Sequence, residues 1–129
     1  SKVAPFRTDF VGATRALVTE RLFEKGADPL LVQKVAYDMS LRSPAVAVPT
    51  LAKLLSFDFA TVLPSVHVPV YAINSDLVPT DAERIGKSLH DFTLDVLPHS
   101  GHFLMLEVPE RFNPLLTKDI EALAARAAR

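Results

Sequence analysis

The sequence has 129 residues, of which 49% are hydrophobic and 22% are charged, and its formal net charge at pH 7 is −1. A chain of this length and composition can bury a sizeable core, and its near-zero charge excludes both a disordered chain and an electrostatically driven nucleic-acid binder. It contains no cysteine, which excludes disulfides, thiolate nucleophiles and cysteine metal sites.

The first half of the chain is predicted to be helical. Apolar residues recur at helical spacing from Asp9 to Phe23, and Gly26 then provides a C-terminal stop. Asp28-Pro29 and Ser43-Pro44 each have the N-cap and first-turn proline that begin a helix, although Pro49 weakens the third pattern. We therefore expect a helical segment over residues 1–60. Its helices are expected at about 7–25, at about 29–42 and from 44 onward.

After Pro64 the pattern changes to strands alternating with helices. Val68–Ile73 is short, β-branched and apolar on both alternations, as in a strand covered on both faces, and Phe92–Leu97 is predicted to be a second strand. A helix of about 81–90, capped by Thr80, would connect them as a parallel β-α-β unit. A last helix should cover about 109–126, before a tail that frays into solvent. The predicted fold class is α/β, with residues 61–129 forming a β-α-β-α unit.

A parallel sheet of two strands raises a physical difficulty. It leaves at least one hydrogen-bonding edge open, and so small a sheet is marginal even when helices cover it. We therefore expect these strands to be an incomplete part of a larger sheet. The open edge could pair with a second copy, as a homodimer, or with a complementing N-terminal half.

Two polar residues follow the predicted strands and are candidates for catalysis. Asp76 follows the first strand and His102 the second, and the carboxyl ends of neighbouring parallel strands meet at one edge. A carboxylate directed at an imidazole fixes its tautomer, while the imidazole carries a proton near neutral pH. Gly101 is expected to provide the tight turn before His102. The other reading of Asp76 is a residue that closes a turn.

The segments VPVYAINSDLVPT (68–80) and DFTLDVLPHSGHFLMLEVPERFN (91–113) closely resemble the C-terminal part of α/β-hydrolase-fold enzymes. In that family the acid follows the penultimate strand and the histidine the last one. The resemblance implies that Asp76 is the acid and His102 the base of a triad, and that residues 1–60 resemble the family's cap. It also implies hydrolysis of an ester, thioester or related bond in an apolar small-molecule substrate, with no cofactor.

The sequence departs from the family pattern in two ways. Ile73–Asp76 replaces the usual Gly-x-x-Asp turn, which leaves Asp81 as a fallback acid. No Gly-x-Ser-x-Gly motif or equivalent occurs in the 129 residues, so the nucleophile, whether Ser, Asp or Cys, is missing and the isolated chain should be inactive. We expect a fragment of a hydrolase; the alternatives are a split-enzyme subunit and a non-catalytic interaction or ligand-binding module that pairs through its sheet edge.

Other residues have competing interpretations. Glu107 could orient the histidine loop, but a carboxylate at the start of the last helix is the preferred reading. His99 and His102 form an H-x-x-H with no third ligand nearby, so no metal site is expected. Apolar residues of the first half could line an acyl-sized pocket, although such stripes are usually core; they include Phe10, Phe23, Tyr37 and Met39.

No uninterrupted apolar run is long enough for a membrane span, and we expect a cytoplasmic protein.

Overall fold

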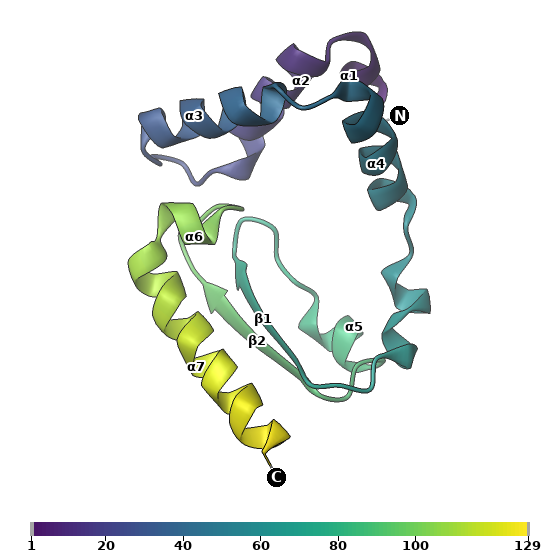
Figure 1. Cartoon of the computed structure of the whole chain (residues 1–129), viewed down its shortest axis with the longest axis vertical. Coiled ribbons are helices and arrows are strands. Elements are labelled where there is room, and N and C mark those ends of the chain that lie inside the picture. Colours follow the sequence, from purple (N-terminus) through teal and green to yellow (C-terminus); the bar gives the residue numbers. More distant parts are fainter. Residues whose placement is uncertain (1, 129) are drawn as a thin grey trace. The chain divides into compact units, whose positions relative to one another are not determined.

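The computed structural model describes residues 2–128 and divides into two compact units, Ser1–Asp58 and Phe59–Arg129 (Figure 1). We call them the helical unit and the sheet unit. Among residues 2–128, no single helix is long and apolar enough to cross a membrane. The bent pair Pro44–Ser56 and Phe59–Ser65 reaches that limit only when the two are taken together, by length and composition.

The helical unit contains four α-helices and one π-helical turn within the described residues: α1 (Ala4–Thr8), α2 (Phe10–Leu17), η1 (Val18–Leu22), α3 (Pro29–Ser40) and α4 (Pro44–Ser56). The single helix predicted for residues 7–25 is wrong, because Asp9 leaves the helical conformation and begins α2 as its N-cap. The Asp9 carboxylate accepts a hydrogen bond from the Gly12 N–H at 2.9 Å. A Cβ at position 12 would overlap the Asp9 carboxylate, so this cap depends on glycine.

The second and third helices begin where the sequence predicted. Asp28 is the N-cap of α3, and its carboxylate accepts from the Leu30 N–H at 2.9 Å. Ser43 precedes α4 without a side-chain capping bond, and Pro49 lies inside that helix. Val18, Ala36 and Val48 are among the buried apolar residues of this unit.

The sheet unit contains two strands and three α-helices within its described residues: β1 (Val70–Ser75), α5 (Ala82–Gly86), β2 (Phe92–Leu97), α6 (Leu104–Glu107) and α7 (Pro109–Ala127). Two short 3₁₀ turns, η2 (Phe59–Thr61) and η3 (Leu63–Ser65), precede them. The strands are parallel, in a register that runs from Val70 opposite Phe92 to Ser75 opposite Leu97. The α/β class and the small, incomplete sheet are therefore confirmed.

Three local predictions in this unit need correction. The first strand runs from Val70 to Ser75, whereas it was predicted over Val68–Ile73. The connecting helix α5 is shorter than expected, and its N-cap is Asp81 rather than Thr80. The hydroxyl of Thr80 instead accepts a hydrogen bond from the Asn74 amide.

The last helix covers Pro109–Ala127, close to the predicted 109–126, and an ion pair joins its C-terminal turn to the sheet. The Arg126 guanidinium donates to both carboxylate oxygens of Asp91 and also reaches the Tyr71 hydroxyl. The hydrogen bonds from Arg126 lower the pKa of the Asp91 carboxyl. The same bonds raise the pKa of Arg126. These contacts join the end of α7 to β1 and to the start of β2, and α7 continues to Ala127.

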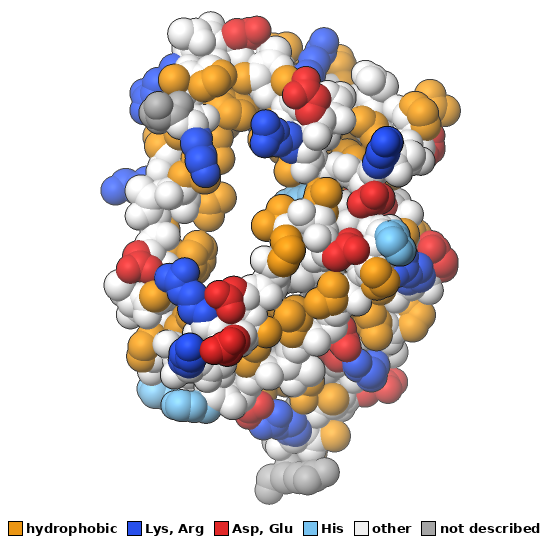
Figure 2. All heavy atoms as spheres, turned by 180° about the vertical axis from the view of Figure 1, so that it is seen from behind, with side chains coloured by type: hydrophobic (Ala, Val, Ile, Leu, Met, Phe, Trp, Pro, Cys, Tyr) orange, Lys and Arg blue, Asp and Glu red, His pale blue; other side chains and the backbone are white. Residues whose placement is uncertain are grey.

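The sheet unit exposes large apolar side chains. Val96 on β2 is 48% exposed, and Leu116 and Ile120 on α7 are 40% and 56% exposed. Many hydrophobic side chains are visible at the surface in Figure 2. This exposure agrees with a sheet whose apolar surface is covered only in part by its own helices.

Candidate active site

His102 lies on the segment Pro98–Phe103 between β2 and α6, which we call the histidine loop. Asp76 directly follows β1, and the register places the ends of β1 and β2 side by side, Ser75 opposite Leu97. Both candidates therefore follow the carboxyl ends of adjacent parallel strands, as the β-α-β prediction requires. The His102 side chain is exposed, and its ring meets the Phe103 ring edge-on at a centroid distance of 5.1 Å.

The Asp76 carboxylate binds the backbone of the histidine loop. Its Oδ2 accepts from the His99 N–H at 3.0 Å, and its Oδ1 accepts from the Ser100 N–H at 3.4 Å. The bond from His99 is the main reason that the pKa of Asp76 is lowered from 3.8, and the Ser100 bond adds to it against partial desolvation. Among the residues that the structure describes, no hydrogen bond joins Asp76 to the His102 imidazole. That pairing stays a prediction.

The tight turn of the loop falls at His99 and not at Gly101. His99 has a φ of +54°, the left-handed conformation that few residues other than glycine adopt. The next residue, Ser100, is 1% exposed, and its hydroxyl donates to the Leu97 carbonyl at 2.6 Å. These bonds hold His99 in its less favourable conformation, while Gly101 is buried within the loop.

Glu107 holds the loop on either side of His102. Its Oε2 accepts from the Gly101 N–H at 3.1 Å, and its Oε1 accepts from the Phe103 N–H at 3.3 Å. The preferred reading of Glu107, a carboxylate at the start of the last helix, is therefore wrong, and the alternative reading as an orienting carboxylate is correct. The carboxylate bridges the two residues that flank His102, so it fixes the backbone from which the imidazole projects.

Arg111 completes the set of contacts and was missed by the sequence reasoning. Its guanidinium donates to the Pro98 carbonyl, the first of the histidine loop, at 2.8 Å. Its place in the first turn of the last predicted helix, next to the loop, was the available signal. Together, side chains from the end of β1, from α6 and from α7 hold the loop, and this pre-organisation favours a catalytic side chain.

Asp81 is less suited to the role of fallback acid. Its carboxylate is the N-cap of α5 and accepts from the Arg84 N–H at 2.9 Å. Among residues 2–128 there is also no group of three or more His, Asp or Glu side chains that could hold a metal ion.

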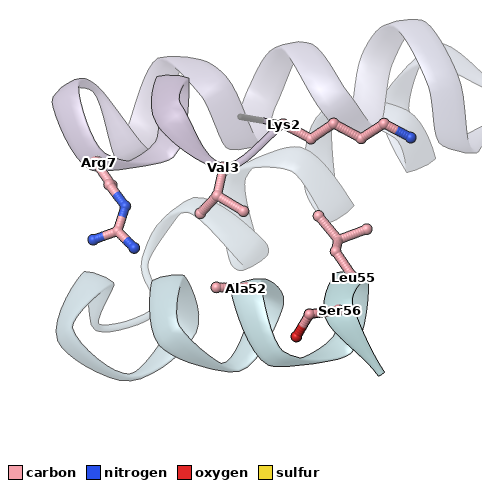
Figure 3. A pocket seen from close by; sticks show the side chains of 6 residues that line it. All are labelled: Lys2, Val3, Arg7, Ala52, Leu55 and Ser56. Carbon is pink, nitrogen blue, oxygen red and sulfur yellow. The ribbon is translucent and has the colours of Figure 1, made fainter. Parts of the chain in front are cut away.

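Two hollows in the described part of the helical unit differ in character. One has a volume of about 560 Å³ and an apolar lining that includes Phe10, Leu17 and Met39. The other, of about 310 Å³, lies between α1 and α4. Figure 3 shows that its two cationic side chains, Lys2 and Arg7, extend toward opposite ends. They do not converge on one anion, so the smaller hollow has no built binding site.

Solved structures resemble this chain over both of its units. An esterase (EaEST) from Exiguobacterium antarcticum matches with a TM-score of 0.81 and 19% identity, covering 93% of this chain and 46% of its own. Est816, described as an N-acyl homoserine lactone degrading enzyme, matches with a TM-score of 0.68 and 23% identity, over 91% of this chain and 50% of its own. A thermophilic esterase from Thermogutta terrifontis, in a malate-bound structure, matches with a TM-score of 0.76 and 18% identity, covering 95% of this chain and 48% of its own.

The chain has part of an α/β-hydrolase fold. It spans about half the length of the esterases that it matches, and identities of 18–23% establish the fold alone. No protein-family model matches the sequence, and no curated protein matches it either. The α/β-hydrolase fold explains why so small a sheet has exposed apolar surface, since the matched esterases contain further chain.

Proposed function

We propose that this chain is the C-terminal portion of an α/β-hydrolase that cleaves esters or related bonds, with His102 as its general base and acid. The observation that carries the proposal is the place of His102. It follows the end of β2, on a loop that Asp76 and Glu107 hold by the backbone, in a fold shared with esterases. In this proposal the helical unit acts as the cap.

The proposed reaction uses a nucleophile from outside these 129 residues. When that group is a hydroxyl or thiol, it attacks the carbonyl carbon of the substrate while His102 takes its proton, and His102 then protonates the leaving alcohol, which leaves the acyl group bound to the nucleophile. Water, deprotonated by His102, next attacks this acyl group, and His102 returns the proton to the nucleophile as the acid is released. The Asp76 carboxylate, at the neighbouring strand end, stabilises the positive imidazolium that forms in between. We expect a neutral substrate with apolar groups, and the chemistry requires no cofactor.

The test compares the 129-residue chain with a longer polypeptide that includes the coding sequence upstream of Ser1. The longer protein should contain a strand, a nucleophile turn and a helix, and should hydrolyse p-nitrophenyl butyrate, whereas the chain alone should be nearly inactive. His102→Gln should lower kcat by roughly 10³-fold or more. His90→Gln is the matched control, since His90 is exposed and lies outside the histidine loop.

Two results would contradict the proposal. One is an upstream sequence without any strand-nucleophile-helix element. The other is hydrolysis by the longer protein that His102→Gln leaves at the wild-type rate.

The exposed apolar residues of the sheet unit favour a second candidate, a non-catalytic module that pairs through its sheet edge. Val96 belongs to β2, and Leu116 and Ile120 belong to the adjacent α7. Pairing would cover these side chains in a second copy or in another polypeptide. A dimer that survives dilution in light-scattering measurements would support self-pairing, and a monomer at every concentration would exclude it.

A further inference from the structure

We propose that Asn74 is a positioning residue for Asp76, because its hydrogen bond with Thr80 closes the segment that carries this carboxylate. Asn74 lies on β1, two residues before Asp76, and its side-chain amide donates to the Thr80 hydroxyl at 2.5 Å. Both side chains are half-buried. The bond joins the end of β1 to the start of α5, and the segment between these elements in Figure 1, residues 76–81, is called the aspartate loop.

Both ends of this bond are fixed by regular structure. Asn74 pairs with Val96 in the parallel ladder. At the other end, the Thr80 carbonyl accepts from the Ala82 N–H at 2.9 Å, and Asp81 is the N-cap of α5. A contact between two fixed points limits the conformations of the chain between them, as any loop closure does.

The middle of the aspartate loop is held by few other contacts. Within residues 2–128, neither Leu77 nor Val78 takes part in a hydrogen bond between backbone groups, and Val78 is 71% exposed. The strand ladder ends at Ser75, so it fixes Asp76 from one side only. We therefore attribute the restraint on the other side to the side-chain bond that closes the loop.

The orientation of Asp76 is important because its two oxygens have separate partners on the histidine loop. Oδ2 accepts from the His99 N–H at 3.0 Å, and Oδ1 accepts from the Ser100 N–H at 3.4 Å. The longer bond lies near the distance limit for a hydrogen bond, so a small rotation of the carboxylate would break it. A residue that limits this rotation therefore helps to keep the histidine loop in place.

The relevance of this restraint to catalysis rests on the proposed function, in which Asp76 stabilises the imidazolium of His102. The restraint itself concerns only the geometry of Asp76 and requires neither activity nor a nucleophile. It can be measured on the 129-residue chain, so its failure and the failure of the hydrolase proposal are separate results.

The two asparagines of the chain allow a test that needs no variant. Asn74 is half-buried and bonded to Thr80, whereas Asn113 on α7 is exposed. In protein labelled with ¹⁵N-asparagine, the side-chain NH₂ protons of Asn74 should exchange with water roughly 5-fold more slowly than those of Asn113, since a neutral hydrogen bond contributes about that factor to an equilibrium constant. This comparison decides whether the bond exists even if a variant fails to fold.

The deciding measurement is the titration of the Asp76 carboxyl carbon by NMR. The hydrogen bonds from His99 and Ser100 lower the pKa of Asp76 from 3.8. Asn74→Ala should move this pKa back toward 3.8, and the amide protons of His99 and Ser100 should exchange roughly 5-fold faster. A bond that only stabilised the fold would change the unfolding midpoint and leave the pKa of Asp76 in the folded protein unchanged.

Variants of Thr80 test the bond from its other end. Thr80→Val removes the hydroxyl at similar volume and should raise the pKa of Asp76 as Asn74→Ala does, whereas Thr80→Ser keeps the hydroxyl and should restore a pKa close to that of the wild type. The double variant Asn74→Ala/Thr80→Val should shift this pKa no further than either single variant. Thr93→Val is the matched control, since Thr93 is also half-buried but lies near the start of β2.

Three results would overturn the proposal. One is exchange of the Asn74 side chain as fast as that of Asn113. Another is a pKa of Asp76 that stays at its wild-type value in both Asn74→Ala and Thr80→Val. The third is a shift of the same size in Thr93→Val, because it would show a general loosening of the sheet unit.

Discussion

Glu107→Ala should loosen the histidine loop, because it removes the carboxylate that accepts from the N–H groups of Gly101 and Phe103. Hydrogen bonds to a charged group contribute about 1.5–3 kcal/mol each. Glu107 is only half-buried, so the lower value applies to both bonds, and their loss should cost about 3 kcal/mol. Glu107→Gln keeps one accepting oxygen and should cost roughly half as much.

Amide hydrogen exchange measures this loss at the two residues concerned. A cost of about 3 kcal/mol corresponds to roughly 100-fold faster exchange at the Gly101 and Phe103 amides if the loop opens locally. Glu110→Gln is the control, because Glu110 is exposed in the first turn of α7 and should leave both amides protected. Unchanged protection of Gly101 and Phe103 in Glu107→Ala would refute the assignment of these bonds to loop stability.

Three further predictions concern the stability of the fold at low pH, the start of α2 and the end of α7. The N–H groups of the histidine loop lower the pKa of Asp76, so the ionised carboxylate stabilises the fold fully above pH 3.8, and this contribution is lost as the pH falls through the lowered pKa. Asp76→Asn should therefore lower the urea midpoint of unfolding at pH 7, but not at a pH below the lowered pKa. Gly12→Ala should cost about 1 kcal/mol in urea unfolding by displacing the N-cap carboxylate, whereas Gly86→Ala, where a Cβ meets nothing, should not destabilise; equal effects would contradict the capping argument. Arg126→Ala should fray the last turn of α7, visible as a loss of helical carbon shifts at residues 123–127, and a fully helical turn would show that the ion pair is not needed.

The parts of the fold that were predicted correctly have strong local signals. In Phe92–Leu97 the apolar residues Phe92, Leu94 and Val96 alternate with Thr93 and Asp95, and the structure has the strand at the predicted bounds. The parallel pairing followed from the crossover rule. Asp28-Pro29 fixed the start of α3 because a capping side chain and a first-turn proline act within a few residues of each other.

The parts that were missed depend on contacts that periodicity cannot detect. Asp9 interrupts a continuous helical pattern because its carboxylate caps the Gly12 N–H. The role of Glu107 depends on α6, which has only four residues and no measurable period. Arg126 holds the end of α7 through Asp91, which lies 35 residues away in the sequence.

The hydrogen bonds of the histidine loop are also close together along the chain. The longest of them, between Asp76 and Ser100, spans 24 residues, and the others span between 3 and 23. Short separations make loop closure cheap in entropy, so this geometry can form early and without help from distant sequence. The side chains that hold the histidine loop thus all lie within residues 76–111, so a graft that keeps the presentation of His102 needs this segment together with β1, the strand that pairs with β2.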